Sequence, residues 1–339
     1  MDVKISVVIP MYNGSKSIEK CIYALDRQTM EPEYEVLIVD DASTDDSLDK
    51  VRELVRTLNR KTLFQVIACE QNGRAGSARN IGIQRAKGEY VLFIDQDDYP
   101  DEKMLKSLYD MTKAGSIDCV SCNVGDKKDT VYQRTQLGIR KKLSVTDRLA
   151  LMKGHGYVFA MLIRRQLILK HKLFFPTNVM FEDSLYNFGV FLSVSSFANV
   201  NEPLYIRSID ENSQTAYLNE KKIRDRIRST KWYMDNYFQN VDNKEYMDCI
   251  NGEAFYYIYL SCAWWTCINK NLRNRKLFLD ICKSAEGIPV DFRYIKKKER
   301  RYSKAKLLIL QILYRNHSLY SPASKVLCQI YSYMKRKGN

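Results

Sequence analysis

Five apolar runs, separated by segments of helical periodicity, constrain this chain more than any other feature of its sequence. The runs begin at Ile5 (ISVVI), Tyr34 (YEVLIV), Phe64 (FQVIA), Tyr90 (YVLFI) and Ile117 (IDCVSC), so successive starts lie 26 to 30 residues apart. Strands that are apolar almost throughout and alternate with helices are typical of a parallel sheet covered on both faces. The first part of the chain is therefore predicted to be an α/β domain with right-handed crossovers.

The chain changes character near residue 215. Its 339 residues carry 54 Lys and Arg against 40 Asp and Glu, a net charge of +14. Residues 1–215 hold 29 of each sign, so the whole excess lies in 216–339, where long helical patterns rich in Tyr, Trp, Lys and Arg dominate. This asymmetry predicts two domains, 1–215 and 216–339, and the second has either a polyanionic partner or a solvated helical surface.

The sequence predicts that the chain has no membrane-spanning helix, no signal peptide and no disulfide framework. The uncharged segment 254–268 is too short for a membrane span, which needs ~20 mostly apolar residues. The start, MDVKISVVIP, has no signal-peptide cleavage site. The nine scattered cysteines do not form a disulfide pattern, and Cys119 and Cys122 are expected to be buried thiols rather than metal ligands. The expected location is the cytoplasm.

Polar residues follow four consecutive apolar runs, where ligands bind in open parallel sheets. The segments are Pro10–Gly14, Asp40–Ser43, Glu70–Asn80 and Asp95–Asp98. Asp95 and Asp97 lie one residue apart on the last of these turns and could share Mg²⁺ or Mn²⁺, which prefer oxygen ligands and often also bind substrate phosphates. A solvated turn is the alternative for an acidic tripeptide considered alone.

Two further loops carry local predictions. Gly76 and Gly82 do not have the spacing of a dinucleotide-binding motif, and we expect them to allow close packing of the helix that follows. Ser43 and Asp46 have the spacing of a capping box at the start of the second helix.

The segments ISVVIPMYNGSKSIEKCI, YEVLIVDDASTDDS, NGRAGSARNIGIQRAKGEYVLFIDQDD and FEDSLYNF together resemble glycosyltransferase family 2. The resemblance covers about residues 3–215. It implies a GT-A fold, a Rossmann-like and mostly parallel sheet with helices on both faces, here followed by a C-terminal helical region. It also implies a metal-dependent, inverting transfer of a hexosyl group from a nucleotide-diphospho-sugar, with a UDP-sugar as the expected donor. The implied pathway is bacterial surface polysaccharide synthesis, of capsule, exopolysaccharide or lipopolysaccharide.

The resemblance implies roles for individual residues. Asp183 would be the general base and Glu182 its acidic neighbour, although both could instead favour the start of a helix. Asp97 and Asp95 would hold Mn²⁺ or Mg²⁺. The residues implied in nucleotide-sugar binding are Pro10, Tyr12, Asn13, Asp40, Asp41, Asn72, Arg79, Asp95 and Gln96. His155 and Arg207 are candidate acceptor or phosphate contacts, and the segment GHGYV around His155 departs from the family pattern.

The basic helical region is expected to serve membrane association, oligomerisation or acceptor binding. Lys304–Tyr314 is an apolar helix with basic flanks, and Trp264 and Trp265 suit a membrane interface. The expected partners are the nucleotide-sugar donor, a glycan or lipid-linked acceptor, an anionic surface on the inner face of the membrane, and a second copy of the chain. No nucleic-acid module is recognised. The alternative function is a non-catalytic protein that binds sugar nucleotides or polyanions.

Overall fold

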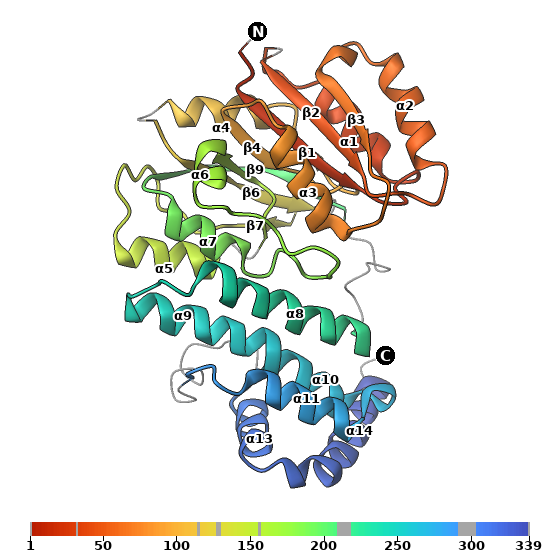
Figure 1. The fold of residues 1–339 in the computed structure, drawn as a ribbon, viewed down its shortest axis with the longest axis vertical. Coiled ribbons are helices and arrows are strands. Elements are labelled where there is room, and N and C mark those ends of the chain that lie inside the picture. Colours follow the sequence, from red (N-terminus) through yellow and green to blue (C-terminus); the bar gives the residue numbers. More distant parts are fainter. Residues whose placement is uncertain are drawn as a thin grey trace. The chain divides into compact units, whose positions relative to one another are not determined.

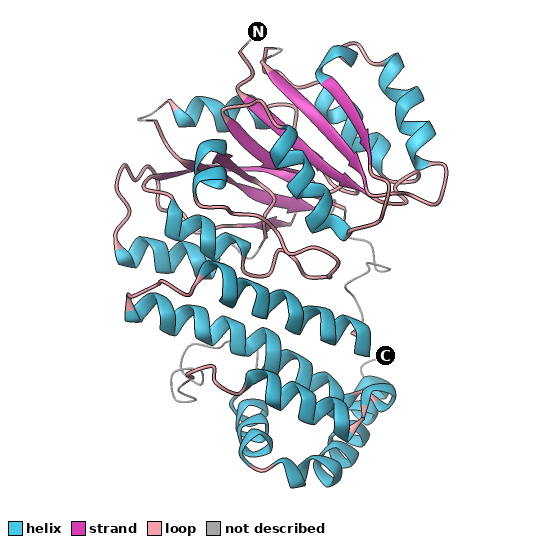
Figure 2. Ribbon diagram, viewed as in Figure 1, coloured by secondary structure: helices cyan, strands magenta, loops and turns pink. Residues whose placement is uncertain are grey.

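The computed structural model describes residues 2–31, 33–113, 116–126, 130–154, 157–208, 218–290 and 303–337. The chain divides into two compact units, Met1–Ser213 and Gln214–Asn339, and each is described by itself. Unit 1 mixes strands and helices, and the described part of unit 2 is helical (Figures 1 and 2).

Unit 1 is built on one sheet with the strand order β3-β2-β1-β4-β8-β6-β9-β5, and β7 pairs with β6. The strands are β1 (Ile5–Met11), β2 (Tyr34–Asp40), β3 (Phe64–Ala68), β4 (Tyr90–Phe93), β5 (Tyr99–Pro100), β6 (Cys119–Asp126), β7 (Val131–Tyr132), β8 (Met161–Arg164) and β9 (Phe197–Arg207). All five predicted runs form strands. Strands β1 to β4 are parallel, and β8 lies antiparallel between β4 and β6. The mostly parallel α/β prediction is thus confirmed.

Helices cover both faces of this sheet. The helices of unit 1 are α1 (Ile18–Asp26), α2 (Ser47–Thr57), α3 (Arg74–Arg85), α4 (Met104–Thr112), α5 (Val145–Gly154), α6 (Arg165–Lys170) and α7 (Tyr186–Ser193). Ile5, Val7 and Ile9 belong to the core cluster that also holds residues of α1 and α4, whereas Val8 faces α3. Side chains of a strand alternate between faces, so a strand buried on both sides must be apolar throughout, as β1 is.

Glycines let α3 approach the sheet. A Cβ at Gly82 would lie 2.2 Å from Val8 Cγ1, and one at Gly76 would lie 2.3 Å from the carbonyl oxygen of Pro176. Both distances are far below van der Waals contact. The predicted close packing at these two glycines is confirmed, and it brings the start of α3 against the 175–182 segment.

Unit 2 contains α8 (Glu220–Tyr237), α9 (Lys244–Phe255), α10 (Ser261–Ile268), α11 (Arg275–Ala285), α13 (Lys304–Arg315) and α14 (Tyr320–Lys337). Asn219, Asn243, Asn274 and Ser303 accept hydrogen bonds from the first turns of α8, α9, α11 and α13. Its aromatic core includes Phe278 stacked on Tyr320 at 4.1 Å between ring centroids. No helix within the described residues combines the length and apolar character needed to cross a bilayer.

The contact between α3 and β1 predicts a stability effect. Gly82→Val should lower the free energy of unfolding by about 1–3 kcal/mol, because the added methyl groups overpack the space held by Val8. Gln84→Val adds the same side chain at an exposed position of α3 and serves as the matched control. Urea denaturation followed by circular dichroism measures both, and equal midpoints for the two variants would contradict the packing argument.

Candidate functional site

The loops that follow β1 and β2 are tied together by short polar side chains. The backbone N–H of Asn13 donates to Ser43 Oγ at 2.9 Å, and the N–H of Thr44 donates to Asn13 Oδ1 at 2.8 Å. Ser43 Oγ in turn donates to the buried carboxylate of Asp40. The capping-box prediction is wrong: α2 begins at Ser47, and Ser43 bonds to the strand end instead.

Asp41 is a buried carboxylate, and only one of its two side-chain oxygens has a hydrogen-bond partner among the described protein groups. Its Oδ1 accepts the N–H of Gly73 at 2.8 Å, and its backbone carbonyl accepts from the Asn72 side chain at 3.0 Å. Its Oδ2 is buried and has no hydrogen-bond partner among the described protein groups. Burial raises the pKa of Asp41, and N–H donors from Gly73 and Arg74 oppose that shift. A donor from a ligand could satisfy the second oxygen.

Gln96 fixes the end of β1. Its side-chain oxygen accepts the N–H of Tyr12 at 2.9 Å, and its side-chain nitrogen donates to the carbonyl of Tyr12 at 3.2 Å. Pro10 is buried within β1 itself. These three residues from the predicted nucleotide site are thus brought to one place, with Gln96 acting on the Tyr12 backbone.

Arg79 joins three separate parts of the chain. It is 4% exposed on α3, and its Nη2 donates to Asp95 Oδ1 at 2.8 Å while its Nη1 donates to Glu182. Its guanidinium also lies 5.4 Å from the ring centroid of Phe175. Burial alone would lower the pKa of Arg79, but Asp95, Glu182 and Asp183 raise it above its ordinary value. The structure therefore brings together four residues that were predicted for the site.

Glu182 and Asp183 lie just before α7, which begins at Tyr186. The carbonyl of Asp183 accepts the N–H of Tyr186 at 3.2 Å, so the pair does stand at a helix start. Asp183 keeps partial solvent exposure. Burial of its carboxyl group and the charge of Glu182 raise the pKa of Asp183 to about 7, and Arg79 opposes the shift. A carboxyl group with such a pKa can exchange protons near neutral pH.

The acidic turn after β4 contains two environments. Asp97 is exposed, whereas Asp98 is buried, accepting from Tyr205 Oη at 2.7 Å and from the N–H of Ser208 at 2.8 Å. Burial and the charges of Asp95 and Asp97 raise the pKa of Asp98 to about 7. Asp98 thus positions the turn through Tyr205, a residue that the sequence analysis did not identify because it is distant in the chain.

The same turn can be tested as a cation site. No cluster of three or more His, Cys, Asp or Glu residues able to hold a metal is present in the ranges that the structure describes. Asp95 and Asp97 nevertheless supply hard oxygen donors on one turn, and their like charges favour neutralisation by a cation. Mg²⁺ typically binds one or two carboxylates and completes its shell with water and substrate phosphates. The donor set fits such an ion and does not fit an all-protein cage.

A column of aromatic rings lies close to Asp98. Tyr157 stacks on Phe159 at 4.9 Å, and Phe159 stacks on Tyr205 at 4.5 Å between centroids. The Arg207 guanidinium lies 5.2 Å from the Tyr157 centroid, and Tyr157 is exposed at the end of the column. Arg207 is therefore held beside an exposed ring that could contact a ligand. His155 lies outside the described residues.

Asn80 is a further positioning residue that the sequence analysis did not single out. Its side chain donates to the carbonyl of Phe175 at 2.9 Å and accepts the N–H of Phe175 at 2.8 Å. These two hydrogen bonds to the backbone hold the segment that leads to Glu182 against α3. The signal that could have identified it is its place directly after Arg79 in the segment NGRAGSARN.

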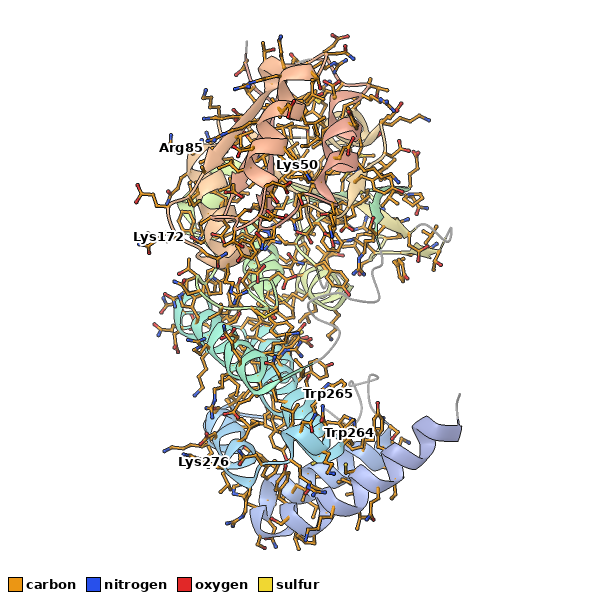
Figure 3. The ribbon with its side chains drawn as sticks, turned by 90° about the vertical axis from the view of Figure 1, so that its right-hand side faces the viewer. Lys50, Arg85, Lys172, Trp264, Trp265 and Lys276 are labelled. Atoms are coloured by element: carbon orange, nitrogen blue, oxygen red, sulfur yellow. The ribbon has the colours of Figure 1, made fainter. Side chains whose placement is uncertain are left out.

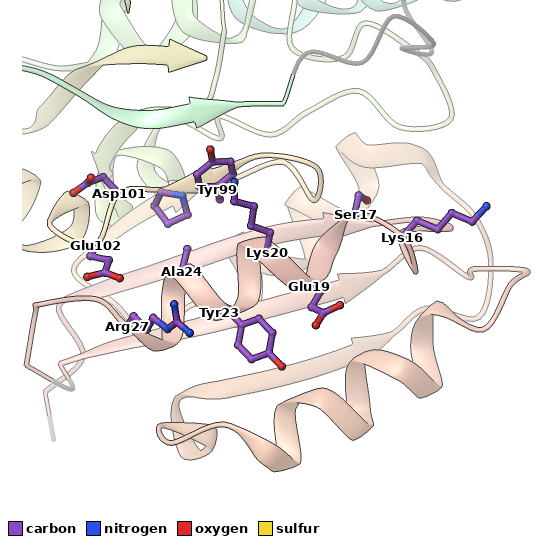
Figure 4. A pocket seen from close by; sticks show the side chains of 11 residues that line it. Lys16, Ser17, Glu19, Lys20, Tyr23, Ala24, Arg27, Tyr99, Asp101 and Glu102 are labelled. Atoms are coloured by element: carbon purple, nitrogen blue, oxygen red, sulfur yellow. The ribbon is translucent and has the colours of Figure 1, made fainter. Parts of the chain in front are cut away.

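A groove of about 650 Å³ lies elsewhere in unit 1, beside α1 (Figure 4). It is lined by Lys16, Lys20, Tyr23, Tyr99 and Glu102 among others, and Lys20 Nζ lies 3.5 Å from the Tyr99 centroid. None of the residues predicted to bind the nucleotide sugar or to act in catalysis lines it. The clustered acids and Arg79 identify the candidate site better than this hollow does, because they carry the chemistry.

Part of the chain matches a known protein family. Residues 6–172 match the family described as Glycosyl transferase family 2. The fold is that of GT-A glycosyltransferases, and residues 6–172 of the N-terminal unit are similar to glycosyl transferase family 2.

Two curated relatives and one solved structure illustrate the similarity. The uncharacterized glycosyltransferase EpsJ of Bacillus subtilis is 32% identical over 222 residues, which are 62% of each chain. The poly(ribitol-phosphate) beta-glucosyltransferase of Bacillus spizizenii is 31% identical over 64% of this chain and 34% of its own. The crystal structure of Staphylococcus aureus TarS 1–349 in complex with UDP-GlcNAc superposes with a TM-score of 0.69 at 18% identity, covering 99% of this chain and 93% of that one. The present chain thus spans less than two thirds of either curated relative, and the likeness to TarS establishes the fold.

Removal of Arg79 should destabilise unit 1. Arg79→Gln leaves Asp95 and Glu182 without their shared partner, and we expect a loss of about 3 kcal/mol in the free energy of unfolding. The control is Arg85→Gln, at the exposed end of the same helix (Figure 3). Urea unfolding monitored by circular dichroism measures both variants. An Arg79→Gln protein as stable as the control would show that the ion pairs do not hold the site together.

Proposed function

We propose that this protein is an inverting glycosyltransferase that moves a hexosyl group from a UDP-sugar to an acceptor hydroxyl in bacterial surface polysaccharide synthesis. The observation that carries the proposal is the ion-pair network of Arg79, which joins a strand-end acid to the Glu182–Asp183 pair. The names of the relatives, among them a poly(ribitol-phosphate) glucosyltransferase and a structure with UDP-GlcNAc, support both the donor and the glycan acceptor.

The nucleotide would bind at the ends of β1 and β2. Asp41 Oδ2 is the buried oxygen without a described partner, and it suits the ring N–H of uracil, which is a single donor. Tyr12 follows Met11, whose carbonyl accepts the N–H of Asp41 at 2.8 Å, and the backbone of Tyr12 is held by Gln96. Asp40, Asn13 and Asn72 would then act mainly by holding these loops in place. The side chain of Asp40 bonds to Ser43 within its own loop, and those of Asn13 and Asn72 bond to the neighbouring loop.

Mn²⁺ or Mg²⁺ would be held by Asp97 and Asp95. When bound, the ion supplies positive charge that stabilises the departing diphosphate. Asp95 remains within 2.8 Å of Arg79 Nη2, so the arginine fixes the orientation of one proposed ligand. Asp98 holds the turn from its buried side through Tyr205.

Asp183 would be the general base. Its carboxylate takes the proton of the acceptor hydroxyl while that oxygen bonds to the anomeric carbon from the face opposite the leaving group. The bond between the anomeric carbon and the diphosphate oxygen breaks with its electron pair on the diphosphate, so the configuration inverts. Glu182 stays ion-paired with Arg79 and keeps a negative charge beside Asp183, which makes Asp183 more basic.

The acceptor side would include Arg207 and the exposed ring of Tyr157. An aromatic face can pack on a sugar or polyol, and the adjacent guanidinium can pair with a phosphate. His155 belongs to the same proposal through its position two residues before Tyr157 in the sequence. The helical unit would associate with an anionic membrane surface or with a second copy of the chain.

The role of Asp183 predicts a defect in turnover. Asp183→Asn should lower the rate of UDP release from a panel of UDP-sugars by about 10²–10⁴-fold, while UDP affinity changes little. In the unmodified protein the rate should rise with pH up to about 7 and then level off, because Asp183 must lose its proton to act as a base. The exposed Asp49→Asn is the control. A native rate in Asp183→Asn would refute the assignment, and absence of UDP release from every UDP-sugar despite UDP binding would favour the non-catalytic alternative.

The role of Asp97 predicts a defect in metal-dependent binding. Asp97→Asn should weaken the affinity for UDP in the presence of Mn²⁺ but not in its absence, because it removes one ligand charge. A thermal-shift assay with UDP, with and without Mn²⁺, measures this. A ligand that binds the folded protein raises its melting temperature, and at a given concentration a tighter ligand raises it more. If UDP binds the unmodified protein equally well with and without Mn²⁺, the metal role is wrong.

A further inference from the structure

The last two described helices expose apolar side chains where a solvated helix normally carries polar ones. The exposed fractions are 48% for Leu308, 45% for Ile312, 54% for Val326 and 50% for Ile330. Leu308 and Ile312 are four residues apart on α13, and Val326 and Ile330 are four apart on α14, so each pair lies on one side of its helix. We call these four side chains, one pair on each helix, the terminal apolar face.

The buried sides of the two helices are separate from this face. Leu307, Leu310 and Leu313 of α13 are buried, as are Tyr320 and Cys328 of α14. Core packing within unit 2 therefore accounts for one set of apolar residues on each helix and leaves the other set without a structural role.

The charged residues on these two helices are all of one sign. Residues 303–337 contain seven Lys and Arg and no Asp or Glu. Lys304, Arg315 and Lys325 are exposed on these helices. Exposed apolar side chains among cations are typical of helices that lie in the headgroup region of an anionic membrane.

We propose that the terminal apolar face inserts into the surface of a bilayer rich in anionic lipid, with the surrounding Lys and Arg side chains on the headgroups. This inference rests on the membrane association proposed above and not on sugar transfer. A second copy of the chain is a poorer occupant, because a symmetric contact would bring two acid-free basic segments together. The same charge distribution attracts a lipid surface.

Trp264 and Trp265 are poorer candidates for membrane insertion than the sequence pattern indicates. Trp264 and Trp265 lie on α10 and are only partly exposed (Figure 3). The ring of Trp264 lies 4.8 Å from Lys306 Nζ, so part of its surface is already in contact with α13. The aliphatic residues of α13 and α14 are therefore the better candidates for insertion.

Co-sedimentation of the full chain with lipid vesicles tests the proposal. The protein should bind vesicles that contain phosphatidylglycerol, should not bind pure phosphatidylcholine, and should be released by high salt. The variant with Leu308, Ile312, Val326 and Ile330 all replaced by Ser should bind at least about tenfold more weakly, because it loses the apolar contact. Val131→Ser with Ile139→Ser removes exposed apolar residues of unit 1 and should bind as the unmodified protein does.

The remaining outcomes are equally decisive. Equal vesicle binding by the four-Ser variant, or no binding by the unmodified protein, would overturn the proposal. A dimer that the four-Ser variant no longer forms, without vesicle binding, would assign the face to a second copy and also overturn it. Circular dichroism confirms that the variant is folded, and an unchanged thermal shift with UDP and Mn²⁺ separates this failure from a failure of the proposed activity.

Discussion

The candidate site depends on a single buried charge. The guanidinium of Arg79 loses its hydration on α3 and recovers that cost only through Asp95 and Glu182, which come from two other parts of the chain. The acids in turn would repel one another without it. Such a network is stable in one geometry, because a displaced partner leaves an uncompensated charge. The strand end, the helix and the Glu182–Asp183 pair are thereby held in a fixed arrangement before any ligand binds.

Most polar side chains around this network have hydrogen-bond partners, and among the described site residues the buried atoms without one are Arg79 Nε and Asp41 Oδ2. Asn13, Ser43 and Gln96 bond to neighbouring loops, and Asp98 is held by Tyr205 and Ser208. Asp41 Oδ2 remains buried without a partner among the described groups. A loop held this firmly cannot easily rearrange to satisfy the oxygen, so a bound ligand is the natural source of its hydrogen bond.

The sequence predicted the parts of this arrangement that leave a local pattern. Apolar runs identified the strands, because burial on both faces requires them. Strand-end positions indicated Arg79 and Asp95 as candidate site residues, whereas Glu182 was indicated by the family resemblance alone. The antiparallel strand β8 was not foreseen, since a run of three buried residues carries no information on direction. Nor could spacing show that Tyr205 bonds to Asp98 across 107 residues, or that Ser43 would bond to Asp40 instead of capping a helix.

Charged side chains interact in different ways in the two units, and the proposed roles of the units differ accordingly. A buried arginine attracts its acidic partners strongly and in one fixed geometry, and salt screens this attraction little. Exposed lysines are each screened within about 8 Å at physiological ionic strength, so they act only in number and at a surface. Unit 1 has balanced charge, and its buried Arg79 is already paired with two acids, so the proposed metal ion would supply the positive charge that a bound diphosphate needs. Unit 2 carries the entire +14 excess, a distribution that suits weak, additive attraction to an extended anionic surface and is poorly suited to catalysis.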